Sequence, residues 1–233
     1  MKQNALDEES LEIATMNKLE KELGYDCFNG LEEKFGEDST FGRDTTEEIV
    51  LIKNLKSSID KLNPNIPADG KLRAIEILRK DRRIQTPINA NKELYKFIKD
   101  GITVTFKDKN GIDKDDVVKV IDFNDPFEND FLAVRQFKIS GDRYHCRADM
   151  VIFINGLPLV FVELKSSYKN IENAYNDNIR HYKTSIPQVF WHNAFIIISN
   201  GSETKLGTFT SGYKHYSDWK KINSNGDMGG YFS

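Results

Sequence analysis

Apolar residues recur at helical spacing along the first 80 residues of the chain. The spacing predicts three helices, over residues 8–23, 45–62 and 69–80, with Thr45 or Thr46 as the N-cap of the second. Each predicted helix presents one apolar stripe. The stripe positions are Leu6, Ile13, Met16, Leu19 and Leu23 in the first helix, Ile49, Ile52, Leu55, Ile59 and Leu62 in the second, and Leu72, Ile75 and Leu78 in the third.

Strand patterns dominate the chain after these helices. Residues 102–106 alternate between apolar and polar, and an Asn-Gly turn leads to a returning strand over 116–123. Residues 130–140 predict a further strand. A helix is expected over 170–184, followed by a short apolar strand within 194–201.

This order predicts one α/β domain with a mixed central sheet flanked by helices. We expect a single domain over 1–233, with a mainly helical part over 1–100, a core over 101–200 and an extension over 201–233. The Gly-, Asp- and Ser-rich segment 29–44 reads as a loop.

Two apolar runs flank Asn155-Gly156, a strong signal for a tight hairpin turn. A turn centred near Gly156 pairs residues whose numbers add to 312, so Asp149 lies opposite Glu163. Lys165 shares the face of Glu163, because strand side chains alternate. The sequence therefore predicts that two carboxylates and an ammonium converge at the open end of the hairpin.

Two carboxylates on one face of a strand pair repel each other unless a cation compensates them. Mg²⁺ prefers oxygen ligands of this kind. Asp149 and Glu163 are therefore candidate metal ligands, with the backbone carbonyl of Leu164 as an additional one. Lys165 would orient water or stabilise charge in the transition state. The alternative is a pair of surface carboxylates with a simple Glu–Lys ion pair.

Composition narrows the class of protein. The net charge of −3 excludes a strongly basic nucleic-acid coat, although a local basic patch remains compatible with DNA binding. No apolar run is long enough for a membrane-spanning helix, and the acidic N-terminus is unlike a signal peptide. The lone cysteines Cys27 and Cys146 fit a reduced, cytoplasmic protein.

The carboxylate and lysine spacing, D-x13-E-x-K, resembles the core of PD-(D/E)xK nucleases. The phrase "RADMVIFINGLPLVFVELKS" is similar to the nuclease segment of the restriction (R, or HsdR) subunit of type I restriction-modification enzymes. Ala148 stands where that family usually has proline. The resemblance implies a restriction-endonuclease-like fold, with Asp149, Glu163 and Lys165 as catalytic residues.

The resemblance extends over nearly the whole chain. The segments "LEKELGY", "FGRDTTEEIVLIKNLKSSIDKLNPNIP" and "SNGSETKLGTFTSGYKHYSDWK" are similar to the family's N-terminal helices and to the stretch before its motor domains. The helix after the hairpin resembles the family's Gln-x-x-x-Tyr motif, with Asn178 in place of glutamine and Tyr182 retained. Asn178, Tyr182 and Arg180 are therefore expected to support the site near the DNA backbone.

The family resemblance also implies cofactors and partners. We expect Mg²⁺, with Mn²⁺ as an alternative, cleavage of double-stranded DNA, and assembly with methyltransferase (M) and specificity (S) subunits. The sequence has no phosphate-binding G-x-x-x-x-G-K-[ST] motif. ATP is therefore expected to act only in a full-length subunit, of which this chain would be the nuclease part.

Further candidate residues follow from the same chemistry. Nucleases of this core often take another carboxylate from the first helix, for which the candidates are Glu8, Glu9 and Glu12. The candidate phosphate contacts are Arg143, Arg147, Lys169 and Arg180.

Two other functions compete with this interpretation. One is a standalone restriction or repair nuclease with the same core. The other is an inactive or weakly active docking module that assembles the restriction complex. The intact Asp149, Glu163 and Lys165 argue against the docking module, whereas Asn178 leaves it open.

Overall fold

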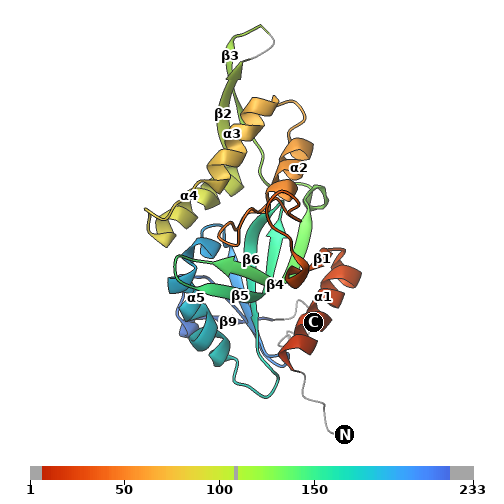
Figure 1. Cartoon of the computed structure of the whole chain (residues 1–233), viewed down its shortest axis with the longest axis vertical. Helices are drawn as coiled ribbons and strands as arrows, with labels where there is room; N and C mark the ends of the chain where they lie inside the picture. Colours follow the sequence, from red (N-terminus) through yellow and green to blue (C-terminus); the bar gives the residue numbers. More distant parts are fainter. Residues whose placement is uncertain (1–6, 108–109, 221–233) are drawn as a thin grey trace.

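A mixed seven-stranded sheet forms the centre of the computed structural model, which describes residues 7–107 and 110–220 (Figure 1). The strand order is β1-β4-β5-β6-β7-β8-β9, with β1/β4 and β6/β7 parallel and the other neighbours antiparallel. The strands are β1 (Asp26–Asn29), β4 (Phe131–Ser140), β5 (His145–Ile154), β6 (Leu157–Leu164), β7 (Phe195–Ser199), β8 (Thr204–Gly207) and β9 (Ser217–Asp218). The expected α/β architecture, a restriction-endonuclease-like fold, is confirmed.

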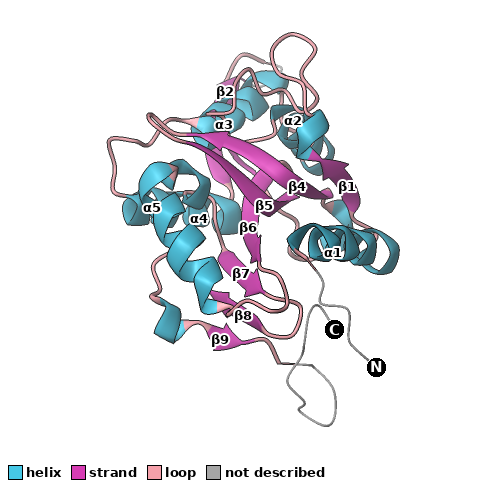
Figure 2. Cartoon of the chain, turned by 60° about the horizontal axis from the view of Figure 1, so that its bottom comes forward, coloured by secondary structure: helices cyan, strands magenta, loops and turns pink. Residues whose placement is uncertain are grey.

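Helices lie on both sides of this sheet, with α1 on one side and α5 on the other (Figure 2). The helices are α1 (Glu8–Leu23), α2 (Ile52–Leu62), α3 (Ala68–Arg79), α4 (Pro87–Asp100) and α5 (Arg180–Ser185). A π-helical segment, Ala174–Ile179, leads into α5. Short 3₁₀ turns occupy Gly30–Glu32, Pro126–Glu128, Pro187–Phe190 and Tyr213–His215. The first predicted helix has the predicted bounds, because Gly24 ends it in the left-handed region at φ 70°.

A two-stranded hairpin stands apart from the central sheet. β2 (Ile102–Lys107) and β3 (Asp113–Val118) pair with each other, pack along α3 and extend away from the sheet (Figure 1). The returning strand was predicted over 116–123, and this prediction is wrong beyond Val118. The side chain of Asn63 bonds both the N–H and the carbonyl of Lys119, at 2.7 and 2.9 Å, so these groups are not available to a strand partner.

The second helix begins later than predicted, at Ile52 instead of Thr45, and neither threonine caps it. The Thr46 carbonyl accepts a hydrogen bond from the Ser140 N–H at 2.9 Å, and the two hydroxyls lie 2.6 Å apart. Leu51 N–H donates to the Gly156 carbonyl at 2.9 Å. These tertiary partners hold residues 45–51 on β4 and the hairpin turn, which prevents an earlier start of the helix.

Helix α4 was not predicted from the sequence, and several of the predicted stripe positions are wrong. Thr86 caps α4 by accepting from Asn89 N–H, and Pro87 takes its first position. The stripe positions that prove to be exposed are Ile13, Leu23 and Leu72, and Leu6 lies outside the described residues. The apolar faces that do pack include Leu11 in α1 and Ala74 in α3.

The central sheet takes strands from all three expected parts of the chain. β1 comes from the part over 1–100, and β8 and β9 come from the part after 200. The internal divisions expected from the sequence therefore do not coincide with the bounds of the sheet. Among the described residues, no helix combines the length and the apolar character needed to cross a bilayer.

Candidate active site

The hairpin of β5 and β6 has the predicted register at its open end. Met150 pairs with Val162, and Asp149 and Glu163 follow directly on their strands. The two pairs next to the turn, Phe153–Pro158 and Ile154–Leu157, add to 311, and the register shifts by one residue between Ile152 and Phe153. The shift, which was not predicted, gives the sum of 312 at the open end and so brings the two carboxylates side by side, as the sequence predicted.

Asp149, Glu163 and Lys165 come together at this end of the hairpin. Asp149 Oδ2 accepts a hydrogen bond from the Leu164 N–H at 2.7 Å, which fixes the carboxylate against β6. Glu163 is fully buried, and its Oε1 accepts from Lys165 Nζ at 3.2 Å. Lys165 N–H donates to the Ser199 carbonyl on β7, so the backbone after the strand is also held.

Helix α1 contributes two further carboxylates from one face, because residues four apart in a helix lie above each other. Glu8 Oε1 lies 3.9 Å from Lys165 Nζ and 3.2 Å from Lys169 Nζ. Glu12 is buried, whereas Glu9 is exposed. Of the three candidates in the first helix, Glu8 and Glu12 face the site.

The sequence analysis missed the partners of Glu12. Gln136 Nε2 donates to Glu12 Oε1 at 2.6 Å, and Arg135 Nη1 lies 3.4 Å from Glu12 Oε2. Both partners lie on β4, more than 120 residues away from Glu12. The one signal in the sequence was a pair of adjacent polar residues within an apolar strand.

Burial and mutual repulsion shift the proton affinities of the carboxyl groups. Burial, reinforced by the charge of Asp149, raises the pKa of Glu163 well above its usual value. Burial also raises the pKa of Asp149. The pKa of Glu12 is raised to about 7, again by burial first and by Asp149 second. These shifts show that burial and the neighbouring carboxylates both oppose the ionisation of these groups.

Lys165 remains a cation in this environment. Burial lowers the pKa of Lys165, but the carboxylates of Glu163, Asp149 and Glu8 outweigh that effect, so the net pKa is raised. A lysine with a raised pKa is protonated at neutral pH. It can donate hydrogen bonds and positive charge, but it cannot act there as a general base.

The oxygen atoms of this cluster fit a hard divalent cation. Glu163 Oε2 is buried and accepts no hydrogen bond from a donor within the described part of the chain, and the Asp149 carboxylate lies within hydrogen-bond reach of Glu163. No three His, Cys, Asp or Glu side chains among the described residues form a complete protein-only metal site. Mg²⁺ does not require one, because it usually keeps several waters and binds through one or two carboxylates together with substrate phosphate.

The helix after the hairpin brings Asn178 and Tyr182 toward the same region. Asn178 Nδ2 donates to the Tyr182 hydroxyl at 3.3 Å, and that hydroxyl lies 3.4 Å from the Arg147 carbonyl on β5. Burial and then the charge of Glu163 raise the pKa of Tyr182. Asn178 belongs to the π-helical segment Ala174–Ile179, an irregularity that is frequent at functional sites.

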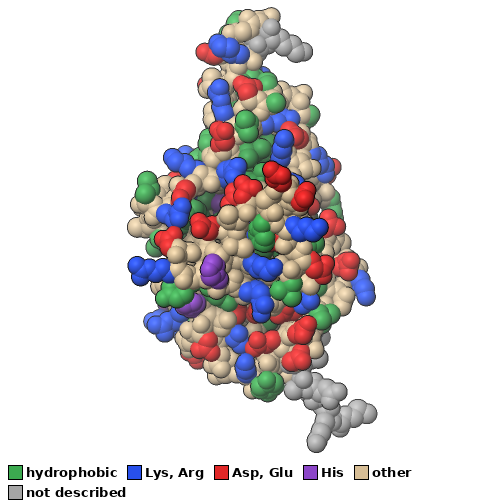
Figure 3. All heavy atoms as spheres, in the orientation of Figure 1, with side chains coloured by type: hydrophobic (Ala, Val, Ile, Leu, Met, Phe, Trp, Pro, Cys, Tyr) green, Lys and Arg blue, Asp and Glu red, His purple; other side chains and the backbone are tan. Residues whose placement is uncertain are grey.

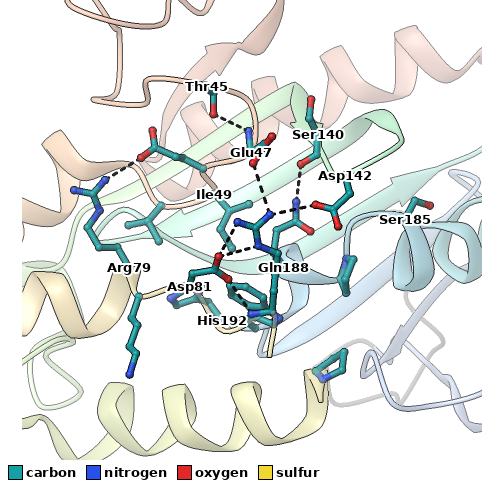
Figure 4. Close-up of a pocket in the computed structure, with 18 of the residues that line it drawn as sticks. Thr45, Glu47, Ile49, Arg79, Asp81, Ser140, Asp142, Ser185, Gln188 and His192 are labelled. Atoms are coloured by element: carbon teal, nitrogen blue, oxygen red, sulfur yellow. Dashed lines mark hydrogen bonds and ion pairs between the residues drawn. The ribbon is translucent and has the colours of Figure 1, made fainter. Parts of the chain in front are cut away.

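The predicted phosphate contacts differ in their positions. Arg147, Lys169 and Arg180 are exposed, and Lys169 is tied to the site through Glu8. Arg143 instead lines a separate cavity of about 760 Å³ between the end of α3, the turn after β4 and the end of α5 (Figure 4). Arg147, Lys169 and Arg180 line no part of this cavity, so Arg143 is set apart from the other three candidates.

Charges within the separate cavity pair with one another. Arg79 Nη2 lies 2.8 Å from Glu48, and Arg83 Nη1 lies 3.2 Å from Asp142. Acidic and basic side chains are likewise interspersed over the face of the molecule seen in Figure 3. The carboxylate cluster differs from both, because its charge is buried and in excess.

Comparison with known proteins assigns the family. The sequence profile described as "Type I restriction enzyme R protein N terminus" matches residues 5–215. The chain belongs to this family. This family is the one that the hairpin phrase and the first helix were found to resemble.

Individual relatives of the family carry names of the same kind. A type I restriction enzyme HindI endonuclease subunit from Haemophilus influenzae is 29% identical over 221 residues, which is 93% of this chain and 20% of that relative. The SauMSSORF170P endonuclease subunit from Staphylococcus aureus is 37% identical over 103 residues, 42% of this chain and 11% of that relative. The chain thus spans about one fifth of the length of the Haemophilus influenzae relative.

Proposed function

We propose that this member of the R-protein N-terminal family cleaves phosphodiester bonds of double-stranded DNA endonucleolytically, with Mg²⁺ or alternatively Mn²⁺. The observation that carries the proposal is the buried, unpartnered Glu163 oxygen beside Asp149 and the Lys165 ammonium. The names of the relatives, which are endonuclease subunits of restriction enzymes, support the reaction class.

In this proposal Asp149, Glu163 and the Leu164 carbonyl would hold the metal, with the Glu12 carboxylate from α1 nearby. A bound Mg²⁺ would lower the pKa of water and neutralise charge on the phosphoryl oxygens. The Leu164 N–H keeps Asp149 in place, and Lys165 supplies a positive charge that stabilises the transition state or orients the attacking water.

The DNA backbone would lie over the exposed cations around the site. Lys169, Arg147 and Arg180 are the proposed phosphate contacts. Asn178 and Tyr182 would support the strand end near Arg147. Assembly with M and S subunits, ATP-driven translocation by a full-length subunit and a cytoplasmic location are parts of the same proposal.

Replacing Asp149 tests the metal site. Asp149→Asn keeps an oxygen that accepts from the Leu164 N–H but removes the negative charge. We expect Mn²⁺ affinity, measured by calorimetry on the folded chain, to fall by about tenfold or more. The matched control is Asp142→Asn, an exposed carboxylate in the separate cavity. Metal binding that survives Asp149→Asn would refute the proposed site.

Replacing Lys165 separates binding from chemistry. In Lys165→Met we expect plasmid nicking by the reassembled restriction complex to fall by about 100-fold, because a positive charge is lost from the transition state. Mn²⁺ affinity should remain or increase, since a competing cation has left the carboxylates. Wild-type nicking by this variant would contradict a catalytic role for Lys165.

A further inference from the structure

Gln136 has an unusual backbone conformation in the middle of β4. Its φ is 54°, in the left-handed region that residues other than glycine seldom adopt. Arg135 pairs with Met150 and Phe137 pairs with Ala148, so Gln136 stands opposite Asp149 without a ladder pairing of its own. Such local strain tends to persist where the surrounding structure requires it, and it is concentrated at functional sites.

The conformation changes where the side chain points. Consecutive residues of a regular strand face opposite sides of the sheet. Here Arg135 and Gln136 are consecutive, yet both side chains contact the carboxylate of Glu12, one on each oxygen. The left-handed conformation of Gln136 therefore directs its side chain to Glu12, on the same side of the sheet as Arg135. Strict alternation would direct it to the opposite side.

The neighbouring segment fixes this distortion. β1 pairs with β4 as far as Arg135, and Gly30 follows β1 directly beside the distorted residue. A Cβ at Gly30 would lie 2.7 Å from the Gln136 carbonyl oxygen and 2.9 Å from that of Arg135. Glycine at position 30 is therefore what allows the displaced carbonyls to pack there.

We infer that Gln136 is a positioning residue, which holds the Glu12 carboxylate toward the metal site through the amide hydrogen bond. The inference rests on the proposed function. An ionised carboxylate only accepts hydrogen bonds, so the Gln136 amide donates its N–H in the 2.6 Å contact with Glu12. This bond fixes the position of the Glu12 oxygen. Residues that hydrogen-bond to metal ligands commonly contribute to metal affinity, because they fix the orientation of the ligand.

The test uses Gln136→Gly in the full chain. Glycine adopts the left-handed conformation more readily than glutamine, which offsets part of the stability lost with the hydrogen bond to the buried Glu12, so this variant should remain folded. It lacks the amide, and we expect its Mn²⁺ affinity to fall by about tenfold. If Gln136 served only the backbone distortion, the glycine variant would bind Mn²⁺ as tightly as the wild type. That result would overturn the inference.

Gln136→Asn provides a second variant that also tolerates the left-handed region. Its amide is one methylene shorter, so we expect it too to bind Mn²⁺ more weakly than the wild type while remaining folded. A wild-type affinity in this folded variant would likewise contradict the inference.

A double-mutant cycle with Glu12→Ala shows whether Gln136 acts through Glu12. We expect Gln136→Gly to have no further effect on Mn²⁺ affinity once Glu12 is alanine. An equal loss in both backgrounds would overturn the inference. Asp149→Asn, measured in parallel, separates the two proposals. If Asp149→Asn leaves metal binding intact, the proposed metal site fails. If Asp149→Asn weakens metal binding and the Gln136 variants do not, only the inferred role of Gln136 fails.

Discussion

Arg43 illustrates how one buried side chain decides local structure. Its guanidinium bonds both oxygens of Glu33, at 3.0 and 2.8 Å, and neither side chain is exposed. It also donates to the carbonyls of Thr46, Glu48 and Lys138 and lies over the Phe137 ring. One residue thereby ties the segment before α2 to β4 and accounts for the late start of the helix.

Removing Arg43 should be costly, because Glu33 would remain buried without its partner. We expect Arg43→Ala to lower the free energy of unfolding by about 3–5 kcal/mol, measured by urea denaturation. Arg79→Ala breaks a partly exposed ion pair with Glu48 and should cost less than about 1 kcal/mol. Equal losses in the two variants would argue against the role assigned to Arg43.

The hairpin of β5 and β6 is the element that carries the site. Asn155 and Gly156 both have positive φ, 52° and 77°, as the predicted tight turn requires. The turn is nevertheless buried: Asn155 Nδ2 donates to the Val120 carbonyl, and the Gly156 carbonyl accepts from Leu51 N–H. Tertiary contacts at the turn thus connect the hairpin to the start of α2.

Gly156→Ala should destabilise the protein for two reasons, the positive φ and the lack of space. A Cβ at Gly156 would lie 2.5 Å from the Leu51 carbonyl and 2.6 Å from the Leu55 nitrogen. Gly111 has the same φ of 77° with nothing near its Cβ position, so Gly111→Ala measures the cost of φ alone. We expect the Gly156 variant to lose at least about 1 kcal/mol more in thermal unfolding. Equal losses would show that the turn can move away from α2.

The helical part and the central sheet are joined by buried polar contacts. Asn91 on α4 donates to the carbonyls of Phe190, Trp191 and Asn193, and His192 Nε2 lies 3.0 Å from the Leu78 carbonyl on α3. These contacts place α3 and α4 against the segment between α5 and β7. These bonds therefore couple α3 and α4 to the part of the chain that leads into the central sheet.

His192 makes that stability depend on pH. Burial lowers its pKa to about 4, against 6.5 for an unperturbed histidine. Between these values the unfolded chain binds a proton that the folded chain does not, so stability is complete above pH 6.5 and falls as the pH decreases toward 4. Between pH 7 and 5 we expect His192 to account for a loss of about 2 kcal/mol.

The comparison variant for this effect is His192→Gln, which keeps an N–H donor for the Leu78 carbonyl but does not titrate. Urea unfolding at pH 7 and pH 5 should give a smaller decrease for this variant than for the wild type. The same decrease in both proteins would assign the pH dependence to other groups.

The sequence by itself determined the hairpin and its chemistry. The period of two along each strand and the Asn-Gly turn are local signals, and together they set Asp149, Glu163 and Lys165 on neighbouring strands. α1 was predictable for the same reason, since its cap and stop residues adjoin it in the chain. The missed α4 also had local signals, in Thr86, Pro87 and its apolar spacing.

Only the tertiary structure decided which distant groups complete the site. Glu12 meets Gln136 across 124 positions of sequence, and Glu8 meets Lys169 across 161. Local periodicity contains no information about such pairs, and it predicts the wrong direction for Gln136 because φ there leaves the extended region. Burial depends on the whole fold as well, and burial is what makes the negative charge of these carboxylates costly unless a divalent cation compensates it.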